Sequence, residues 1–365
     1  MAFEHKMTTR CRGRMVLLNF NKSKRQNYEE KSKSILLVNL GTPSDPSVLA
    51  VTRFLRRFLS DRRVIHMPPL IWQPILNMMV LPKHAPKSAA NYEQLWSSEI
   101  GSPLLHYIQR QAQLLQKRLP DYTVRYAMSY SQPLIGAVLK EFEFQGITDL
   151  TIIPMYPQYS TTTTASVQDD VARFYQDRKT VPEIRFVSDY SSFWPYVKAL
   201  SNKLQKAVAK MNPDAIVFSY HGIPLSYQKA GDPYAQRCRQ TTMAVIERLG
   251  LQIPCFQAYQ SRFGPAKWLT PATKDLLTAL PKQGYRKVLV IAPSFTADCL
   301  ETIQELGEEN RDVFLAAGGN EYQLLPALND DAEWVEALAQ LTLLNAVMPA
   351  QNAAMDLPSA NLQTE

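Results

Sequence analysis

The chain has 365 residues, of which 45% are hydrophobic and 20% charged, and this composition indicates a folded globular protein rather than a disordered one. Its net charge of +7 is concentrated in residues 1–34, which hold nine Lys and Arg against three Glu, so the rest of the chain is almost neutral and nucleic-acid binding is not predicted. The sequence has neither a long apolar run nor CxxC spacing among its four cysteines, which argues against a membrane-spanning helix, a disulfide framework and a structural zinc site. A reducing cytoplasm is therefore the expected compartment.

The basic segment 1–34 lacks the apolar region of a signal peptide. We interpret it as a disordered extension, which a vector remnant or an upstream start would explain. A transit peptide fits less well, because the segment contains three Glu. Residues 344–365 are also expected to be disordered.

Short apolar strands alternate with amphipathic helical patterns along the rest of the chain. The expected strands cover residues 34–40, 122–128, 150–156, 214–220, 255–259 and 287–293. The expected helices lie around residues 88–118, 133–145, 193–211, 232–249 and 270–281. Continuous apolar strands separated by helices predict an α/β fold with parallel sheets covered on both faces.

The chain also repeats itself loosely. "LVNLGTP" (37–43) resembles "VFSYHGIP" (217–224), and "TIIPMYPQYSTTTTASV" (151–167) resembles "LVIAPSFTADCLETI" (289–303). Each pair is a strand, a turn and a helix start, which predicts two similar α/β halves divided near 185–195. The alternative is that all buried strands look alike.

The first half is longer than the second, and much of the excess lies in residues 67–87. This apolar arm contains five prolines and carries little charge before Lys83, so we expect it to be too broken by proline to form a long core helix. Two interpretations stay open. The arm is either a domain-packing element or an exposed apolar lip for an apolar ligand or a membrane surface.

In parallel α/β folds, ligands bind beyond the carboxyl ends of the strands, so the residues that follow each strand are candidates for function. His221-Gly222-Ile223-Pro224 follows the strand "DAIVFSY". This His is a candidate general base or metal donor; the alternative is a His that only hydrogen-bonds a turn. "QSRFGPAKWLTP" (260–271) follows another strand and offers a cation and an aromatic wall for a flat carboxylated ligand, or ordinary loop packing.

An acidic helix is predicted after "KVLVIAP". Its six carboxylates would fall within about 100° of arc on a regular α-helix, with the apolar residues on the other side. These residues are Asp298, Glu301, Glu305, Glu308, Glu309 and Asp312. Like charges at this spacing repel, so the face is either a solvated surface or a path for a metal ion.

Several motifs together resemble the signature segments of ferrochelatases, and they occur in the expected order across roughly residues 35 to 330. They are "NLGTP" (39–43), "IGSP" (100–103), "PMYPQYS" (154–160), "SYHGIP" (219–224), "QSRFGPAKWLTP" (260–271) and "PSFTADCLETIQEL" (293–306). The resemblance, to the bacterial type, implies insertion of Fe²⁺ into a porphyrin with release of two protons. It also implies two similar Rossmann-like domains, 35–188 with the lip at 67–87 and 189–343, with the porphyrin cleft between them.

The resemblance assigns roles to individual residues. His221 and Glu301 match the active-site pair, and with Asp298 and Glu305 they form the expected metal-binding set. Porphyrin-contacting or cleft-lining positions fall on Leu40, Ser102, Arg125, Tyr126, Tyr220 and Trp268. Glu308, Glu309 and Asp312 would form an outer path for iron. A neutral imidazole can accept a proton and carboxylates suit a hydrated divalent ion, but whether His221 takes the proton, binds iron or does both stays open.

The apolar arm resembles the lip of ferrochelatases that take protoporphyrin IX. This resemblance implies protoporphyrin IX as the substrate and protohaem, made in the last step of haem synthesis, as the product. The alternatives are coproporphyrin III, another metal and tetrapyrrole of the class II chelatases, or a non-catalytic haem carrier. No cysteine follows Cys299, so no [2Fe–2S] cluster or other prosthetic group is predicted. We expect a monomer or weak homodimer in the cytoplasm, with peripheral contact to the inner face of the membrane through residues 67–81.

Overall fold

The computed structural model describes residues 33–344, all within the compact unit Ser32–Glu365. Residues 1–32 and 345–365 lie outside the described residues, and the prediction that the two ends are disordered falls almost entirely on them. At the amino-terminal boundary the prediction is wrong by two residues. Lys33 and Ser34 already belong to the first strand.

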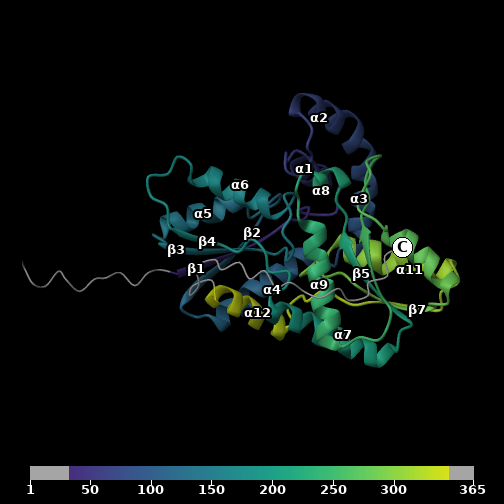
Figure 1. Ribbon diagram of the computed structural model, residues 1–365. Helices are drawn as coiled ribbons and strands as arrows, with labels where there is room; N and C mark the ends of the chain where they lie inside the picture. The colour runs from purple at the N-terminus through teal and green to yellow at the C-terminus, as the bar shows by residue number, and fades with distance from the viewer. Residues whose placement is uncertain (1–32, 345–365) are drawn as a thin grey trace, which may run out of the picture. The chain divides into compact units, whose positions relative to one another are not determined.

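Two four-stranded parallel sheets form the framework (Figure 1). The first has the strand order β2-β1-β3-β4 and is built from β1 (Lys33–Asn39), β2 (Tyr122–Met128), β3 (Asp149–Pro154) and β4 (Glu183–Phe186). The second has the matching order β6-β5-β7-β8, from β5 (Ala215–His221), β6 (Cys255–Gln260), β7 (Lys287–Ile291) and β8 (Glu321–Leu324). The identical order confirms the two similar α/β halves.

Each sheet has an outer face covered by helices of its own half. α5 (Ile135–Phe144) and α6 (Thr164–Tyr175) cover the first sheet, where Val38 and Ile152 pack against Val138 and Val171. In the second half, the outer cover is built from α10 (Thr273–Ala279), the 3₁₀ turn η3 (Leu280–Gln283), the helix η4 (Glu301–Glu309) and α11 (Asn310–Ala316). Strands covered on both faces need continuous apolar runs, and such runs are a clear signal in the sequence.

The inner faces of the two sheets share one hydrophobic core. Leu37 of the first sheet and Phe218 of the second belong to the same buried cluster, which includes the fully buried Trp334. The helices that fill it are α4 (Pro103–Arg118), α7 (Trp194–Met211), α9 (Tyr234–Leu249) and α12 (Ala332–Leu344). In Figure 1, α4 and α9 lie between the strands of the two halves. The short helix α8 (Leu225–Lys229) follows β5.

The apolar arm is helical from Pro69 onward, although its prolines gave no expectation of a long helix in the core. α2 (Pro69–Ile75), the π-helix η2 (Leu76–Val80) and α3 (Leu81–Leu95) follow one another without a break. Pro69 occupies the first turn of the arm, where a missing N–H does no harm. Pro82 stands where η2 passes into α3, and Pro74 and Pro86 stand on the exposed surface. The helix expected at 88–118 is in fact two helices, because a turn closed by Ser97 and Gly101 separates α3 from α4.

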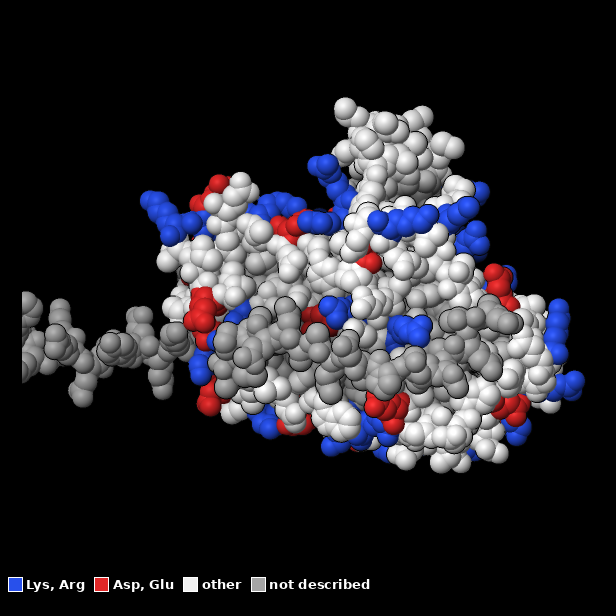
Figure 2. Space-filling model, viewed as in Figure 1, with Lys and Arg blue, Asp and Glu red and all other residues white. Residues whose placement is uncertain are grey.

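One side of the arm packs on α1 (Val48–Leu59) and the other is open to solvent. Leu76, Leu81 and Ala85 are buried, whereas Leu70 and Met78 are 92% and 78% exposed. Figure 2 shows α2 and η2 as a white projection without charged side chains. Among residues 33–344, no helix has the length and apolar character needed to cross a membrane.

Candidate active site

His221 is the last residue of β5, and its ring is held in one orientation by the turn that follows. Its Nδ1 lies 2.7 Å from the carbonyl oxygen of Gly222. A carbonyl can only accept a hydrogen bond, so Nδ1 carries the proton in the neutral ring and Nε2 keeps its lone pair. The side chain is partly exposed, and its free nitrogen is therefore able to accept a proton from a bound molecule.

Gly222 is required because the neighbouring chain comes so close. A Cβ at this position would lie 2.9 Å from the backbone oxygen of Gln260 and 3.2 Å from the indole of Trp268. The N–H of Gly222 donates to the same oxygen of Gln260 at 2.8 Å. The His221 turn is thus clamped between the end of β6 and Trp268.

The acidic segment is not the regular α-helix that the sequence predicts. It starts only at Leu300, and Glu301–Glu309 forms a π-helix, in which hydrogen bonds join residues five apart instead of four. The six carboxylates therefore do not share one helical face. Glu308, Glu309 and Asp312 are exposed, and the last two are already engaged, by Gln304 and Arg311.

Glu305 is a partly buried carboxylate of the π-helix, held from the end of β6. It accepts hydrogen bonds from the backbone N–H of Ser261 at 2.7 Å and from the Ser261 hydroxyl. Burial raises the pKa of Glu305, and the Ser261 bonds oppose this rise. The charge of Glu301 adds to the rise and His221 counteracts it, so both groups lie within electrostatic reach of Glu305.

Glu301 opens the π-helix and faces the base of the arm. Its backbone oxygen accepts from the Gln260 side chain at 3.0 Å. Burial is the main cause that raises the pKa of Tyr92, on α3, and the nearby charge of Glu301 raises it further. The structure thus brings His221, Glu301 and Glu305 together, with Tyr92 close to them.

Asp298, the fourth member of the expected metal-binding set, has a different task. It is only 8% exposed and precedes the helix. Its oxygens accept from Asn329 at 2.7 Å, from Thr302 at 3.0 Å and from the N–H of Ala327 at 3.2 Å. These bonds tie the start of the acidic segment to the chain after β8. Among residues 33–344, no three His, Cys, Asp or Glu side chains are grouped closely enough to hold a metal ion.

Three of the predicted porphyrin positions have other surroundings in this structure. Tyr220 is fully buried in the shared core, where its hydroxyl lies 2.8 Å from that of Thr242. Arg125 and Tyr126 cannot both line one cleft, because successive residues of a strand point to opposite faces. Arg125 is exposed on the edge strand β2, whereas Tyr126 packs against the shared core and accepts from Gln109.

The other three predicted positions lie at ends of secondary-structure elements. Leu40 directly follows β1 and is partly buried, and Ser102 is buried at the start of α4. Trp268 is partly buried against Gly222, and its indole Nε1 is buried with no hydrogen-bond partner in the described part of the chain. A cavity of about 410 Å³ adjoins the same turn, with Trp268, Arg262 and Lys267 in its wall.

Two positioning residues open the motif "QSRFGPAKWLTP" (260–271), although the resemblance assigns a role to neither of them. Ser261 adopts a left-handed backbone with φ of 63°, unusual for a residue other than glycine, and it holds Glu305 with two hydrogen bonds. Gln260 is buried and links the Ser219 hydroxyl on β5 to the backbone of Glu301. Both stand where β6 ends, and their signals in the sequence are that place and the motif that they open.

The comparisons with known proteins identify the family. Residues 32–345 match the family model described as Ferrochelatase. A ferrochelatase of Pectobacterium atrosepticum is 45% identical over 315 residues, which are 86% of this chain and 98% of that protein. One from Yersinia pestis is 43% identical over 316 residues, again 86% and 98% of the two chains.

The fold also matches a solved chelatase. SirB from Bacillus subtilis superposes with a TM-score of 0.52 at 12% identity, over 87% of this chain and 96% of that one. This likeness shows the two-domain chelatase fold alone. Together with the family match over most of its length, it leads to the conclusion that the chain belongs to the ferrochelatase family, the lyases that insert Fe²⁺ into a porphyrin in haem synthesis.

Proposed function

We propose that the porphyrin substrate is protoporphyrin IX and that His221 accepts a proton from it during metal insertion. The observation that carries the assignment of His221 is its fixed tautomer, with Nδ1–H bonded to Gly222 and Nε2 free. Glu301 and Glu305 are the carboxylates beside it. Together they form a proton acceptor next to hard oxygen ligands, which suit a hydrated divalent ion.

The proton balance of the reaction explains why both kinds of group are needed. Two pyrrole N–H bonds break, two N–Fe bonds form from the electron pairs left behind, and two protons leave. Nε2 of His221 takes one proton. Glu305 is suited to take the other, because its raised pKa makes its carboxylate a better base than an exposed glutamate.

We infer that iron approaches along the π-helix. Glu308, Glu309 and Asp312 lie on its exposed end and beyond, and Glu301 and Glu305 lie at its inner part. A hydrated cation can exchange one carboxylate for the next without a permanent site. Asp298 is left out of this path, because its oxygens are already bonded to Asn329, Thr302 and Ala327.

An anaerobic assay with several metals and porphyrins tests the function and its alternatives. We expect Fe²⁺ and protoporphyrin IX to give protohaem with a higher kcat/KM than coproporphyrin III, and cobalt or nickel with other tetrapyrroles to react poorly. A preference for coproporphyrin III would overturn the substrate assignment. Porphyrin binding without metal insertion under all conditions would favour the non-catalytic carrier.

The exposed arm supports both the apolar substrate and a peripheral contact with the cytoplasmic membrane. Leu70, Met78 and Met79 point to solvent with 92%, 78% and 67% of their surface exposed. We expect the triple substitution Leu70→Ser, Met78→Ser and Met79→Ser to release the protein from lipid vesicles. Substituting the exposed Phe144 and Val181, which lie away from the arm, is the matched control. Unchanged vesicle binding would show that the arm serves only packing.

We also propose that the protein carries no [2Fe–2S] cluster and works as a monomer or weak homodimer in the cytoplasm. Cys238, Cys255 and Cys299 are free thiols, and Cys11 lies outside the described residues. Acid-labile sulfide in the purified protein would contradict the first statement. Sedimentation over a range of concentrations tests the second, and cell fractionation tests the location.

A further inference from the structure

A large cavity lies at the carboxyl edge of the first sheet, apart from His221. Its volume is about 1590 Å³. Its wall comes from the turn after β1, from α1 and the chain that follows it, from the loop after β2, and from α6. Six arginines and three aspartates line it: Arg53, Arg56, Arg57, Arg62, Arg63, Arg173, Asp61, Asp169 and Asp170.

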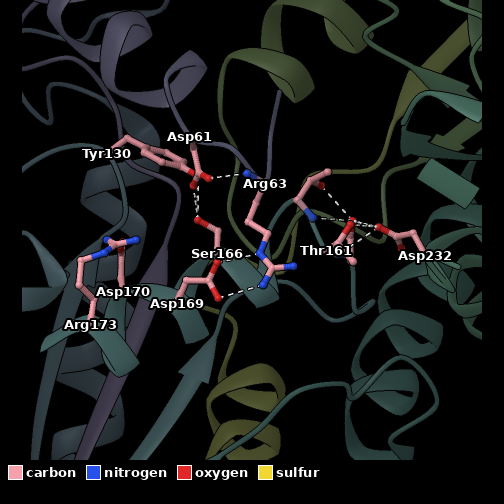
Figure 3. Close-up of polar contacts among 11 residues, drawn as sticks. Asp61, Arg63, Tyr130, Thr161, Ser166, Asp169, Asp170, Arg173 and Asp232 are labelled. Carbon is pink, nitrogen blue, oxygen red and sulfur yellow. Dashed lines mark hydrogen bonds and ion pairs between the residues drawn. The ribbon is translucent and has the colours of Figure 1, made fainter. Parts of the chain in front are cut away.

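The three aspartates already have partners. Asp61 accepts from the Tyr130 hydroxyl and the N–H of Arg63, both at 2.7 Å, and from the Ser166 hydroxyl. The guanidinium of Arg63 donates two hydrogen bonds to the carboxylate of Asp169, of 2.7 and 3.0 Å. Asp170 pairs with the neighbouring arginine of α6 at 2.5 Å. Figure 3 shows these side chains pointing toward one another across the cavity wall.

Three of the arginines have no such partner. Arg53, Arg57 and Arg62 make no ion pair within 4 Å and no side-chain hydrogen bond with any residue in 33–344. The charge of Arg53 does reach Asp45, just before α1. Arg53 and Arg57 stand one turn apart on α1, a spacing at which like charges repel. An anion in the cavity would remove this repulsion, and the forked guanidinium groups match the oxygens of a phosphoryl group.

The cavity and the exposed arm are built on the two sides of the same helix. α1 packs against α3, and Arg56 of α1 donates to Asn77 of the arm at 2.9 Å. Ser60 and His66, which lead from α1 into the arm, also line the cavity. In Figure 2, basic side chains gather around the base of the white projection that the arm forms. An apolar tip above basic residues suits the surface of an anionic membrane.

We propose that the arginine-lined cavity of the first half binds phosphoryl groups, and that its ligand is the phosphodiester headgroup of an anionic lipid beneath the arm. The inference rests on the membrane contact proposed for the arm and does not depend on the chemistry at His221. Arg53, Arg57 and Arg62 supply the free donors. The paired Arg63 and Asp169 hold the wall in shape.

The test uses the whole protein and vesicles of phosphatidylcholine with or without phosphatidylglycerol. We expect the triple variant Arg53→Ser, Arg57→Ser, Arg62→Ser to lose at least about tenfold in affinity for the anionic vesicles, since each basic residue near such a surface contributes to binding. The control variant Arg239→Ser, Lys274→Ser, Lys282→Ser removes the same charge from exposed positions of the second half. It should lose less than about twofold by the same electrostatic argument. Equal losses in the two variants would overturn the proposal, because only net charge would then matter.

Calorimetry with pyrophosphate, without lipid, separates the headgroup from a free phosphate. Binding of pyrophosphate to the intact protein and not to the Arg53, Arg57, Arg62 variant, together with unchanged vesicle affinity, would overturn the lipid assignment in favour of a soluble phosphate compound. A raised KM for porphyrin in that variant, with unchanged vesicle affinity, would instead assign the arginines to the substrate's propionates. Lipid-free metal insertion at the normal rate is expected, and it shows that the variant is folded. Inactivity of the parent protein in that assay would count against the proposed function, not against the cavity.

Discussion

The carboxyl edges of the two sheets share a strand order and differ in their chemistry. In the first half, Gly41 follows Leu40, and a Cβ on this glycine would lie 2.6 Å from the hydroxyl of Ser131. In the second half, Gly222 follows His221, and a Cβ on it would lie 2.9 Å from the backbone oxygen of Gln260. The repeat therefore places an apolar Leu40 where the other half has His221, the proposed proton acceptor.

The charges around the two turns differ as well. The edge of the second sheet has Glu301 and Glu305 close to His221, whereas the edge of the first has an excess of arginine over aspartate. One half is equipped for a cation and the other for an anion. A duplicated fold thus provides two equivalent positions, and the side chains at each position determine what it does.

Removing the imidazole of His221, at the edge of the second sheet, should have the largest effect on kcat. We expect His221→Ala to lower kcat by about 10² to 10⁴, the range typical of a lost general base. His106→Ala, which removes an imidazole from α4, should leave kcat unchanged. Anaerobic Fe²⁺ insertion assays on both variants, with circular dichroism as a check of folding, measure this. Near-normal activity of His221→Ala would remove the residue from the mechanism.

Substituting alanine for Gly41 or for Gly222 should lower the stability of the protein in both cases, but should lower its activity only at Gly222. Gly41 has φ of 114° and Gly222 has a backbone oxygen in the way, so each substitution should cost about 1–3 kcal/mol in the free energy of unfolding. Only Gly222→Ala moves the His221 ring. The folded molecules of the Gly222→Ala variant should therefore have a kcat at least about tenfold lower than the parent protein. A tenfold change corresponds to about 1.36 kcal/mol in the activation barrier. Equal kcat in the two variants would show that the ring does not depend on its turn.

The carboxylate of Glu305, at the carboxyl edge of the second sheet, should make the stability of the protein depend on pH. The pKa of Glu305 is raised above its ordinary value of 4.5, so the folded state holds this proton more tightly than the unfolded state does. The contribution of this proton to the free energy of unfolding is fully present below pH 4.5 and is lost as pH rises through the pKa of Glu305 in the folded state. Glu305→Gln does not titrate, so its unfolding free energy relative to the parent should increase as pH rises above 4.5. Denaturant unfolding at several pH values measures the difference, and a constant difference would contradict the burial of the charge.

The smallest effect is expected at Arg125, on the edge strand of the first sheet. This side chain is exposed and bonds only the backbone oxygen of Val124 among the described residues. Arg125→Ala should change KM for porphyrin by less than about twofold, since surface substitutions are usually worth under about 0.5 kcal/mol. A larger rise in KM would return Arg125 to the porphyrin site that the resemblance assigned to it.

The buried strands could be predicted because continuous apolar runs of this length are typical of strands covered on both faces, and Tyr122–Met128 was predicted to the residue. β4 and β8 were missed, because edge strands of four half-exposed residues carry no such run. His221 was found from its place after β5 and from the ferrochelatase-like motif. The clamp on it was not found, because it depends on how closely Gln260 approaches from another strand.

The π-helix could not be predicted, because distant side chains help to stabilise it. Asn310 donates to the backbone oxygen of Glu305 at 2.8 Å, and the Tyr322 hydroxyl on β8 donates to that of Leu306 at 2.7 Å. These hydrogen bonds satisfy backbone carbonyl groups near the place where the hydrogen bonds of the helix change from joining residues five apart to joining residues four apart. Nothing in the spacing of the acids indicates them. The arginine cavity was likewise hidden, since its wall combines segments more than 100 residues apart.

The shared core has a consequence for the synthesis of the protein. Trp334 lies on α12, the last described helix, which packs against both α7 and α4. The inner face of the first sheet is thus completed by a residue that leaves the ribosome about 300 positions after β1, and chains are synthesised from the amino terminus. We expect nascent chains that end before Ala332 to remain sensitive to protease in both halves. Resistance of the first half in such chains would show that it closes without α12.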